Sequence, residues 1–453
     1  MSSGVAAEAV EDPAPSRMHV WVLAWPAILT FGLESLVGLV DTLMVGRLGA
    51  QPLAGVGVGA QILHGVHVVV IAVGGGTIAL VARFVGAGAR HEAERVLTQS
   101  IYAAALLGAA IALPMYYWAG EAVAAFGVDP VVVREGAGYL RFLMIGLPCA
   151  AAFEIFAAAF RGAGDMRTPL LIGAIINVFN VVANYALIFG GFGFSAMGAR
   201  GSGLASSLAF TLGLLLAIVA MRRRGAVLRP GTGALAFDVG LTRRILRIGF
   251  PAAIEQCFLQ VGFFFYLFIA SKYGTDAMAA YFIGVRVLAL SFLPGLGFGA
   301  AASTIVGQSL GAGRGLEAQR GGWDAVRLAV FLMSGIGVVI FVTAEQIAGA
   351  FVDDARVIAD AVPFIRVLAL AQPLMALDFT LSGALRGAGD TRYPLFVLIA
   401  GFYGARLGCA YIAAYVLDLG LTWVWLSLLG DYAVRATLKI LRFRGGRWQR
   451  VKV

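Results

Sequence analysis

Charged residues are scarce in this 453-residue sequence. Only 13% of the residues are charged, whereas 60% are hydrophobic, and the mean hydropathy is +0.88. An ordinary soluble domain is about half apolar and about a quarter charged, so this composition excludes a soluble globular protein. The formal net charge of +9 does not indicate a nucleic-acid partner, because the arginines lie in short segments between apolar runs. Arginines in that position set the orientation of membrane helices.

Cysteine is also rare. Cys149, Cys257 and Cys409 all lie inside apolar stretches, and an odd number so placed argues against a disulfide framework and against a metal cluster. The sequence has no G-x-x-x-x-G-K-[ST] motif, which excludes ATP hydrolysis by a phosphate-binding loop. Paired nucleophilic or metal-binding groups, which an intramembrane enzyme needs, are missing too. We therefore expect no enzymatic activity, no cofactor and no metal site.

Apolar runs long enough to cross a bilayer are what the sequence has in abundance. A spanning helix needs about 20 apolar residues, and such runs occur about twelve times. The predicted spans are 19–45, 53–80, 96–119, 134–160, 168–190, 202–221, 245–270, 277–306, 322–344, 358–385, 393–417 and 420–440. The sequence therefore predicts an all-α polytopic membrane protein.

Basic residues in the connections predict the orientation of these spans. Arginines concentrate in the even-numbered connections, as at Arg222–Arg224, and in the C-terminal segment, whereas the odd-numbered connections hold few. An excess of arginine marks the cytoplasmic side, so both termini are expected there. We predict a multi-pass protein of a bacterial inner membrane, with residues 1–18 as a cytoplasmic tail and residues 442–453 as a basic cytoplasmic tail.

An internal repeat divides the chain into two halves. When the sequence is shifted along itself so that Phe160 aligns with Leu385, FRGAGDMRTPL at Phe160–Leu170 matches LRGAGDTRYPL at Leu385–Leu395 in eight of eleven positions. Because an even number of spans separates the copies, the halves share one topology, as in transporters with parallel repeats. The predicted organisation is two pseudo-symmetric six-helix lobes, residues 19–221 and 245–441, joined by a cytoplasmic linker at residues 222–244.

Two motifs carry a resemblance to a known family. Pro26 followed by D-T-x-M-V-G at Asp41–Gly46, and the doubled R-G-x-G-D-x-R-x-P motif, resemble the multidrug and toxic compound extrusion (MATE) family, closer to its DinF-like branch. The resemblance extends from His19 to Arg442. It implies a V-shaped pair of helix bundles around a central cavity. It also implies export of organic cations and other drugs in exchange for protons or sodium.

Ionisable groups at bilayer depth are the first candidates for a functional site, because burying them in lipid is costly. Glu34 and Asp41 are seven residues apart in the run 19–45, so both lie on one helix face, roughly 10 Å apart. Asn177, Asn180 and Asn184 share one face of the run 168–190, at a similar depth. We predict that these five residues form the ion-coupling site.

The identity of the coupling ion follows from the ligands available. The resemblance implies that the Asp41 and Glu34 positions serve coupling, and that an acid often stands at the position of Asn184. Hard cations such as sodium need a cage of several oxygen ligands, and the asparagine removes one acid from it. A proton needs only one buried carboxylate, since burial disfavours the charged form. We therefore expect proton coupling, with sodium as the alternative.

A second group of charges lies in other apolar runs. Glu255 and Asp378 accompany Arg286 and Arg406 in the second half, and Glu154 lies in the first half. Two acids and two bases at bilayer depth can neutralise one another. These residues are predicted to form a second-lobe charge network or a substrate site.

The predicted function is secondary-active multidrug efflux, with cationic or amphipathic organic compounds exchanged for protons. One alternative is a lipid or oligosaccharide flippase of the same superfamily, although such proteins tend to have more spans and a more cationic cavity. Another is a major-facilitator exporter, although the connection GAGARHEAER lacks the D-R-x-G-R pattern of that family. We expect drug-like small molecules and the lipid bilayer as partners, no nucleic acid, and a monomer.

Overall fold

The computed structural model describes residues 17–230 and 237–451. Nearly all of the predicted tail 1–18 lies outside these ranges, as do residues 231–236 of the predicted linker and the last two residues of the chain. The described residues form helices and their connections, without a strand. The all-α prediction is confirmed.

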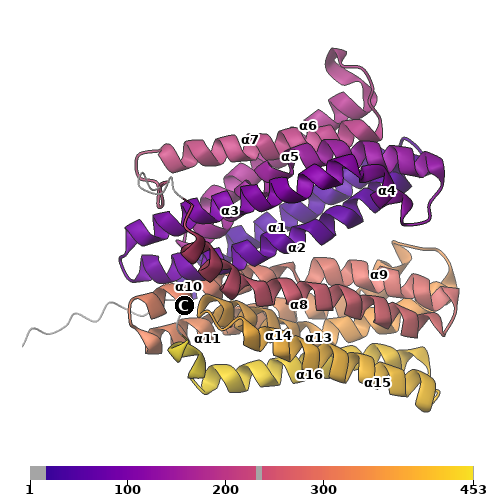
Figure 1. The fold of residues 1–453 in the computed structure, drawn as a ribbon. Coiled ribbons are helices and arrows are strands. Elements are labelled where there is room, and N and C mark those ends of the chain that lie inside the picture. The colour runs from indigo at the N-terminus through magenta and orange to yellow at the C-terminus, as the bar shows by residue number, and fades with distance from the viewer. Residues whose placement is uncertain (1–16, 231–236, 452–453) are drawn as a thin grey trace, which may run out of the picture.

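The helices form two lobes, one above the other in Figure 1. The N-lobe comprises α1 (Arg17–Gly46), α2 (Ala50–Gly86), α3 (Arg90–Tyr117), α4 (Ala119–Ala124), α5 (Pro130–Gly162), α6 (Arg167–Phe189) and α7 (Ala199–Arg222), with a short 3-10 turn η1 (Gly191–Gly193). The C-lobe comprises α8 (Val239–Ser271), α9 (Thr275–Ser291), α10 (Leu293–Gly311), α11 (Gly315–Val342), α12 (Ala344–Gly349), α13 (Ala355–Gly387), α14 (Arg392–Leu398), α15 (Gly408–Tyr411) and α16 (Leu421–Arg444).

The two lobes repeat each other helix by helix. α3, α4 and α5 recur as α11, α12 and α13, and the shift that aligns Phe160 with Leu385 also superimposes both ends of each helix. α2 recurs over the combined length of α9 and α10. The same helix boundaries recur because the turn-forming glycines and the first-turn residues recur with them.

Eleven segments within the described residues are long and apolar enough to cross a membrane, and α9 and α10 together make one of them. α16, with 24 residues, is the twelfth long helix; three charged residues in its interior lower its hydropathy. α1 begins and α16 ends at the same end of the bundle (Figure 1). An even number of crossings requires this arrangement.

The C-lobe departs from the N-lobe in two places. Its second crossing breaks between α9 and α10, beside Pro294. The corresponding helix of the N-lobe, α2, continues without interruption. A proline lacks the backbone N–H that a continuous helix needs. The crossing after α14 becomes π-helical at η2 (Ile399–Leu407) and η3 (Ile412–Val416). There Gly401 lies against α16, where a Cβ would come within 2.6 Å of a carboxylate oxygen of Asp431.

The boundaries of the predicted linker and of the C-terminal tail differ from the structure. α8 begins at Val239, inside the predicted linker, because Asp238 caps it by accepting a 2.9 Å hydrogen bond from the Leu241 N–H. α16 continues to Arg444, and Trp448 beyond it is buried against Phe443. Part of each predicted polar segment therefore belongs to the folded C-lobe.

The lobes join at the end of the bundle where the chain begins and ends. Thr304 Oγ1 on α10 donates to the backbone oxygen of Arg161 at 2.7 Å, and Gln308 Nε2 donates to that of Gly162 at 3.0 Å. Gly86 on α2 lies so close to Gln308 that a Cβ would overlap the backbone carbonyl. Small residues permit this approach between membrane helices, and it holds the lobes shut at this end.

Candidate functional site

Asp41 lies on α1 and faces two asparagines of α6. Asn184 Nδ2 donates to Asp41 Oδ1 at 2.6 Å and to Asn180 Oδ1 at 2.9 Å. Asn180 Nδ2 in turn donates to Ser206 Oγ on α7 at 3.4 Å. Asn184 is fully buried and Asn180 nearly so. Packing of α1 on α6 therefore joins the predicted carboxylate to two of the three predicted amides in one hydrogen-bonded chain.

The hydrogen bonds that link Asp41, Asn184, Asn180 and Ser206 leave one acceptor unused. Asn184 Oδ1 is buried and has no partner among the described residues, and within the same ranges no basic side chain lies within 4.0 Å of Asp41. A protonated Asp41 would become a donor, and rotation of the Asn184 amide would present Oδ1 to accept that hydrogen bond. The pair can therefore hydrogen-bond in either protonation state of the carboxyl group.

The other two predicted members of this site lie apart from this series of hydrogen bonds. Asn177 is half-buried, and no hydrogen bond to its side chain exists in the described part of the protein. Glu34 makes no contact with the amides; it lines a cavity between the lobes. Asp41, Asn180 and Asn184 thus form one cluster, Glu34 lies in the cavity two helical turns away along α1, and Asn177 belongs to neither.

The central cavity has a volume of about 380 Å³ and is lined by both lobes. Its charged and titratable residues are Glu34 (α1), His67 (α2), Glu154 and Arg161 (α5), and Arg386 (α13). Apolar and small residues such as Phe31, Gly75 and Phe379 make up most of the remaining wall. The structure therefore places Glu34 and Glu154 in one compartment, and the helix that supplies Glu154 begins at Pro130, before its predicted start.

The predicted mutual neutralisation of Glu255, Asp378, Arg286 and Arg406 is wrong. Glu255 Oε2 instead pairs with Arg386 Nη2 at 2.6 Å, at the edge of the central cavity. Arg286 is exposed and has no ion pair among the described residues. Asp378 and Arg406 are each fully buried but face residues of α16. None of the four residues pairs with another of the four.

Sequence reasoning missed the three charged residues on α16. Arg406 Nη2 lies 2.7 Å from Asp431 Oδ2, while Asp378 pairs with both Arg435 and Lys439. Lys439 Nζ also reaches Ser382 Oγ. The signal was available, because residues 431, 435 and 439 are spaced four apart and so share one helix face. The predicted span 420–440 contains all three, although they were not among the predicted charges at bilayer depth.

The arginines that open the doubled motif have a place that the sequence did not predict. Arg161 and Arg386, which hold the same position in the two copies of the motif, both line the central cavity. Asp165 of the first copy stabilises the turn between α5 and α6, since it accepts hydrogen bonds from the backbone and the hydroxyl of Thr168 at 2.9 and 2.6 Å. The occurrence of the same arginine in both halves was the signal for a shared role.

Comparisons with known proteins agree with this fold. A family model described as MatE matches the chain twice, over residues 26–186 and 251–412. The shift that aligns Phe160 with Leu385 also aligns Pro26 with Pro251, where the two matches begin, so the matches confirm the internal repeat. The "Probable multidrug resistance protein NorM" of Thermotoga maritima is 31% identical over 445 residues, covering 97% of this chain and 95% of that protein. The "Multidrug resistance protein MdtK" of Edwardsiella ictaluri is 27% identical over 435 residues, covering 93% and 94%.

Solved structures share the fold. An outward-facing structure of a multidrug resistance MATE family transporter of the MOP superfamily superimposes with a TM-score of 0.87, at 23% identity and with 96% of each chain covered. The major-facilitator alternative is therefore wrong, while membership of the DinF-like branch stays a prediction. With its two MatE repeats, its paired lobes and a relative 31% identical over nearly its whole length, the chain belongs to the MatE family and is a membrane transporter, not an enzyme.

Proposed function

We propose that this protein is a secondary-active antiporter that exports cationic or amphipathic organic compounds across a bacterial inner membrane in exchange for protons. The names of its relatives, NorM and MdtK, refer to multidrug resistance, which supports efflux of drug-like compounds. Membership of the MatE family supports transport driven by an ion gradient. No cofactor is needed for that activity.

The observation that carries the proposal is the environment of Asp41. This carboxyl group lies at bilayer depth, accepts a hydrogen bond from Asn184 at 2.6 Å, and has no basic partner within 4.0 Å in the described ranges. An unpaired carboxylate in lipid is costly and marks a site of proton or ion binding. Proton uptake would remove the buried charge, reverse the direction of the hydrogen bond and let α1 repack against α6.

The charges of the central cavity favour a cationic substrate. Glu34 and Glu154 line the cavity with Arg161, while Arg386 is already paired with Glu255. With every group ionised, three carboxylates and two guanidinium groups leave one net negative charge. Complementary charge raises both the local concentration and the specificity of a bound cation.

The arginine-rich loops predict the orientation of the protein in the membrane. We propose that the end of the bundle where α1 begins and α16 ends faces the cytoplasm. The hydrogen bonds that Thr304 and Gln308 make between the lobes lie at the same end. In this conformation the cavity is therefore sealed toward the cytoplasm, as an exporter requires while it releases its substrate to the outside.

A sodium ion fits the Asp41 site less well than a proton. The nearby oxygen atoms are those of Asp41, Asn180 and Asn184, and an amide nitrogen of Asn184 already occupies the space between Asp41 and Asn180. A hard cation needs several oxygens that converge on one point. Glu34, the second acid that a cage would need, lies in the central cavity instead.

Transport by purified protein in proteoliposomes tests the proposal. Efflux of a fluorescent cationic dye is measured under an imposed pH gradient and, separately, under an imposed sodium gradient. We expect the pH gradient alone to drive efflux, and an uncoupler to stop it. Efflux that requires sodium while the pH gradient is intact would refute proton coupling.

A lipid or oligosaccharide flippase is the second candidate. Arg161 favours it, because this guanidinium group lines the cavity and has no carboxylate within 4.0 Å among the described residues. Translocation of fluorescent short-chain phospholipids by the same proteoliposomes discriminates the two. We expect no acceleration of lipid translocation under conditions in which the dye is exported.

Size-exclusion chromatography with light scattering tests the expected monomer.

A further inference from the structure

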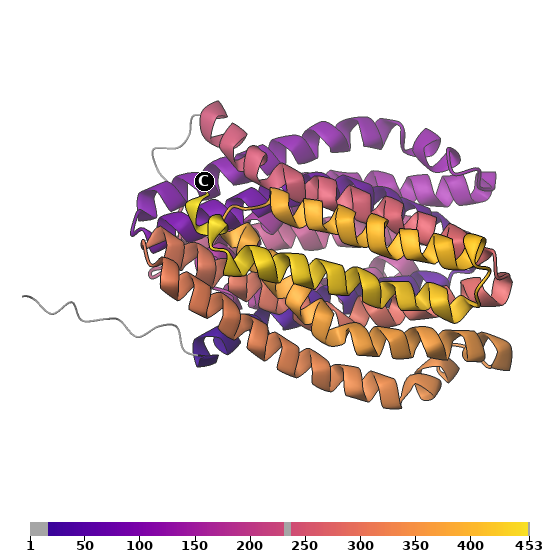
Figure 2. The same cartoon turned by 90° about the horizontal axis from the view of Figure 1, so that it is seen from below.

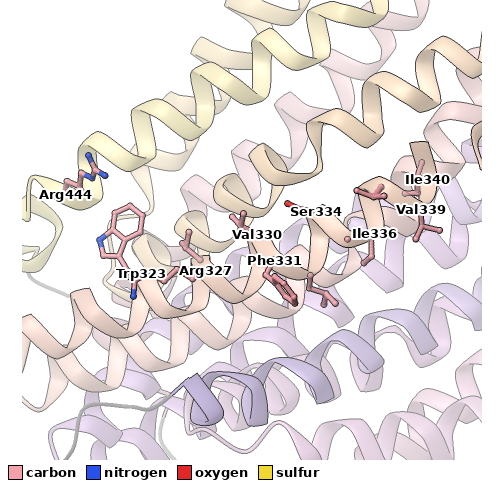
Figure 3. A pocket seen from close by; sticks show the side chains of 13 residues that line it. Trp323, Arg327, Val330, Phe331, Ser334, Ile336, Val339, Ile340 and Arg444 are labelled. Atoms are coloured by element: carbon pink, nitrogen blue, oxygen red, sulfur yellow. The ribbon is translucent and has the colours of Figure 1, made fainter. Parts of the chain in front are cut away.

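A long groove runs along the outer face of the C-lobe, away from the central cavity. It has a volume of about 1280 Å³ and is lined by side chains of α11 together with the last residue of α16. It shares no residue with the central cavity. Figure 3 shows Arg444 on α16 beside Trp323, with the other labelled side chains following α11 away from that end. We name it the outer groove.

One end of the outer groove is basic. The guanidinium group of Arg444 lies 5.7 Å from the centre of the Trp323 ring, and that ring packs edge-on against Phe443 at 5.6 Å. Arg327 stands one turn further along α11 and donates through Nη1 to Asp324 at 3.1 Å. An arginine has five N–H donors, so Arg327 keeps donors for a ligand. Two arginines and one aspartate leave this end with one net positive charge.

Apart from Ser334, the rest of the outer groove is apolar. Phe331, Val338 and Val339 are strongly exposed along it, at 81%, 65% and 61% of their surface. Gly335 lies in the groove with nothing within 4 Å of the position where a Cβ would be, so it leaves a notch in the wall. From Trp323 to Ile340 the helix rises roughly 25 Å, whereas one leaflet of a bilayer core is about 15 Å deep. One acyl chain therefore fits along the groove with its headgroup at the basic end.

The basic end is not a consequence of the repeated fold. α3 is the N-lobe counterpart of α11, and the shift that superimposes these two helices places Trp323 on Thr98 and Arg327 on Tyr102. The same shift places Arg444 on Val219, although α7 also ends in an arginine, Arg222, as α16 ends in Arg444. The combination of a tryptophan and two arginines thus belongs to the C-lobe alone.

We propose that the outer groove binds one anionic phospholipid of the surrounding bilayer. Its phosphate receives hydrogen bonds from Arg327 and Arg444, and the indole N–H of Trp323, which has no partner among the described residues, supplies a third donor. The acyl chain lies along Phe331 and fills the notch at Gly335. Basic residues and tryptophan at the level of the headgroups are the side chains that recognise anionic lipids.

Native mass spectrometry of the purified full chain tests this site. The probes are dioleoyl phosphatidylglycerol and dioleoyl phosphatidylcholine, which have the same acyl chains and differ in headgroup charge. We expect one phosphatidylglycerol to bind at least about fivefold more tightly than phosphatidylcholine. Each surface arginine contributes roughly fivefold to binding of an anionic lipid, so Arg327→Gln with Arg444→Gln should remove the preference.

Two further variants separate the acyl chain from the headgroup. Gly335→Leu fills the notch at a position where nothing lies within 4 Å of an added Cβ, so it should weaken binding of both lipids. Arg222→Gln, at the last residue of α7, and Gly404→Leu, at another exposed glycine with open space around it, are the matched controls and should bind as the wild type does. If the double arginine variant is not recovered as folded protein, Arg444→Gln alone should lose about fivefold.

Several outcomes would overturn the proposal. Equal binding of the two lipids would mean that the groove holds only unselected bilayer lipid. Unchanged binding in Gly335→Leu would mean that no acyl chain occupies it. Displacement of the lipid by millimolar inorganic phosphate would indicate a simple anion site. Dimers that disappear in the groove variants would identify the surface as an interface between two copies of the chain.

Discussion

The buried charges of the C-lobe permit a quantitative prediction about Asp378. Asp378 and Lys439 are fully buried, and with Arg435 they form a cluster against Asp431 and Arg406. With every group ionised, two acids face three bases, so the cluster already carries one net positive charge. Asp378→Asn keeps the shape but raises that charge to two and leaves Lys439 without a carboxylate.

The expected cost follows from the loss of this partner. Removing one member of a buried ion pair costs about 3–5 kcal/mol when the other charge is left uncompensated, whereas replacing a whole buried ion pair by apolar groups of similar volume is often neutral. For a lobe of this size, 1 kcal/mol shifts Tm by about 2–4 °C, so Asp378→Asn should lower Tm by roughly 6–20 °C. Lys439→Met removes the excess positive charge and leaves Asp378 paired with Arg435, so its Tm should stay within about 4 °C of the wild type.

Thermal unfolding in detergent at one scan rate provides the comparison. The double variant Asp378→Asn with Lys439→Met should melt above Asp378→Asn alone, because it removes the ammonium group that has lost its partner. Asp353→Asn, the same chemical change at an exposed residue outside the cluster, is the control and should leave Tm unchanged. If Lys439→Met melts as low as Asp378→Asn, or the double variant is no better than the single one, charge balance does not govern this region.

Three more predictions concern transport and topology. Asp41→Asn should insert and fold normally, because an amide can replace its hydrogen bond to Asn184, yet it should abolish pH-driven dye efflux; efflux at the wild-type rate would remove Asp41 from the mechanism. Gly86→Leu should force the lobes apart at Gln308 and lower the efflux rate at least tenfold. In that variant, a thiol reagent added on the cytoplasmic side should label a cysteine introduced into the central cavity. Efflux and labelling as in the wild type would mean that this contact does not seal the cavity. A cysteine at position 353 should react with an impermeant reagent outside intact cells and one at position 230 should not; the reverse pattern would invert the proposed orientation.

The sequence alone predicted the architecture because the signals for it are local. Each spanning helix is a run of apolar residues long enough for the bilayer, and such a run is visible without knowledge of its neighbours. The repeat predicted two lobes of equal topology, and the helix ends of α3 to α5 and α11 to α13 follow its offset. The juxtaposition of Asp41 and Asn184 also came from the sequence, since both depths could be counted from the ends of their helices.

Boundaries were less predictable where a polar segment continues a helix. The start of α8 at Val239 depends on the Asp238 cap, and the burial of Trp448 depends on Phe443 of α16. Hydropathy assigns both segments to the loops, because their exposed faces are basic. A cap residue followed by a polar first turn would have predicted the earlier start of α8.

Which charge faces which partner was decided only by the tertiary structure. Glu255 pairs with Arg386, more than a hundred residues away, and the packing of α16 against α13 and the π-helical η2, visible in Figure 2, supplies the partners of Asp378 and Arg406. Composition shows that charges at bilayer depth must be compensated, but it does not show by which helix. That choice depends on how the helices rotate and pack, and it is made by contacts between residues far apart in the sequence.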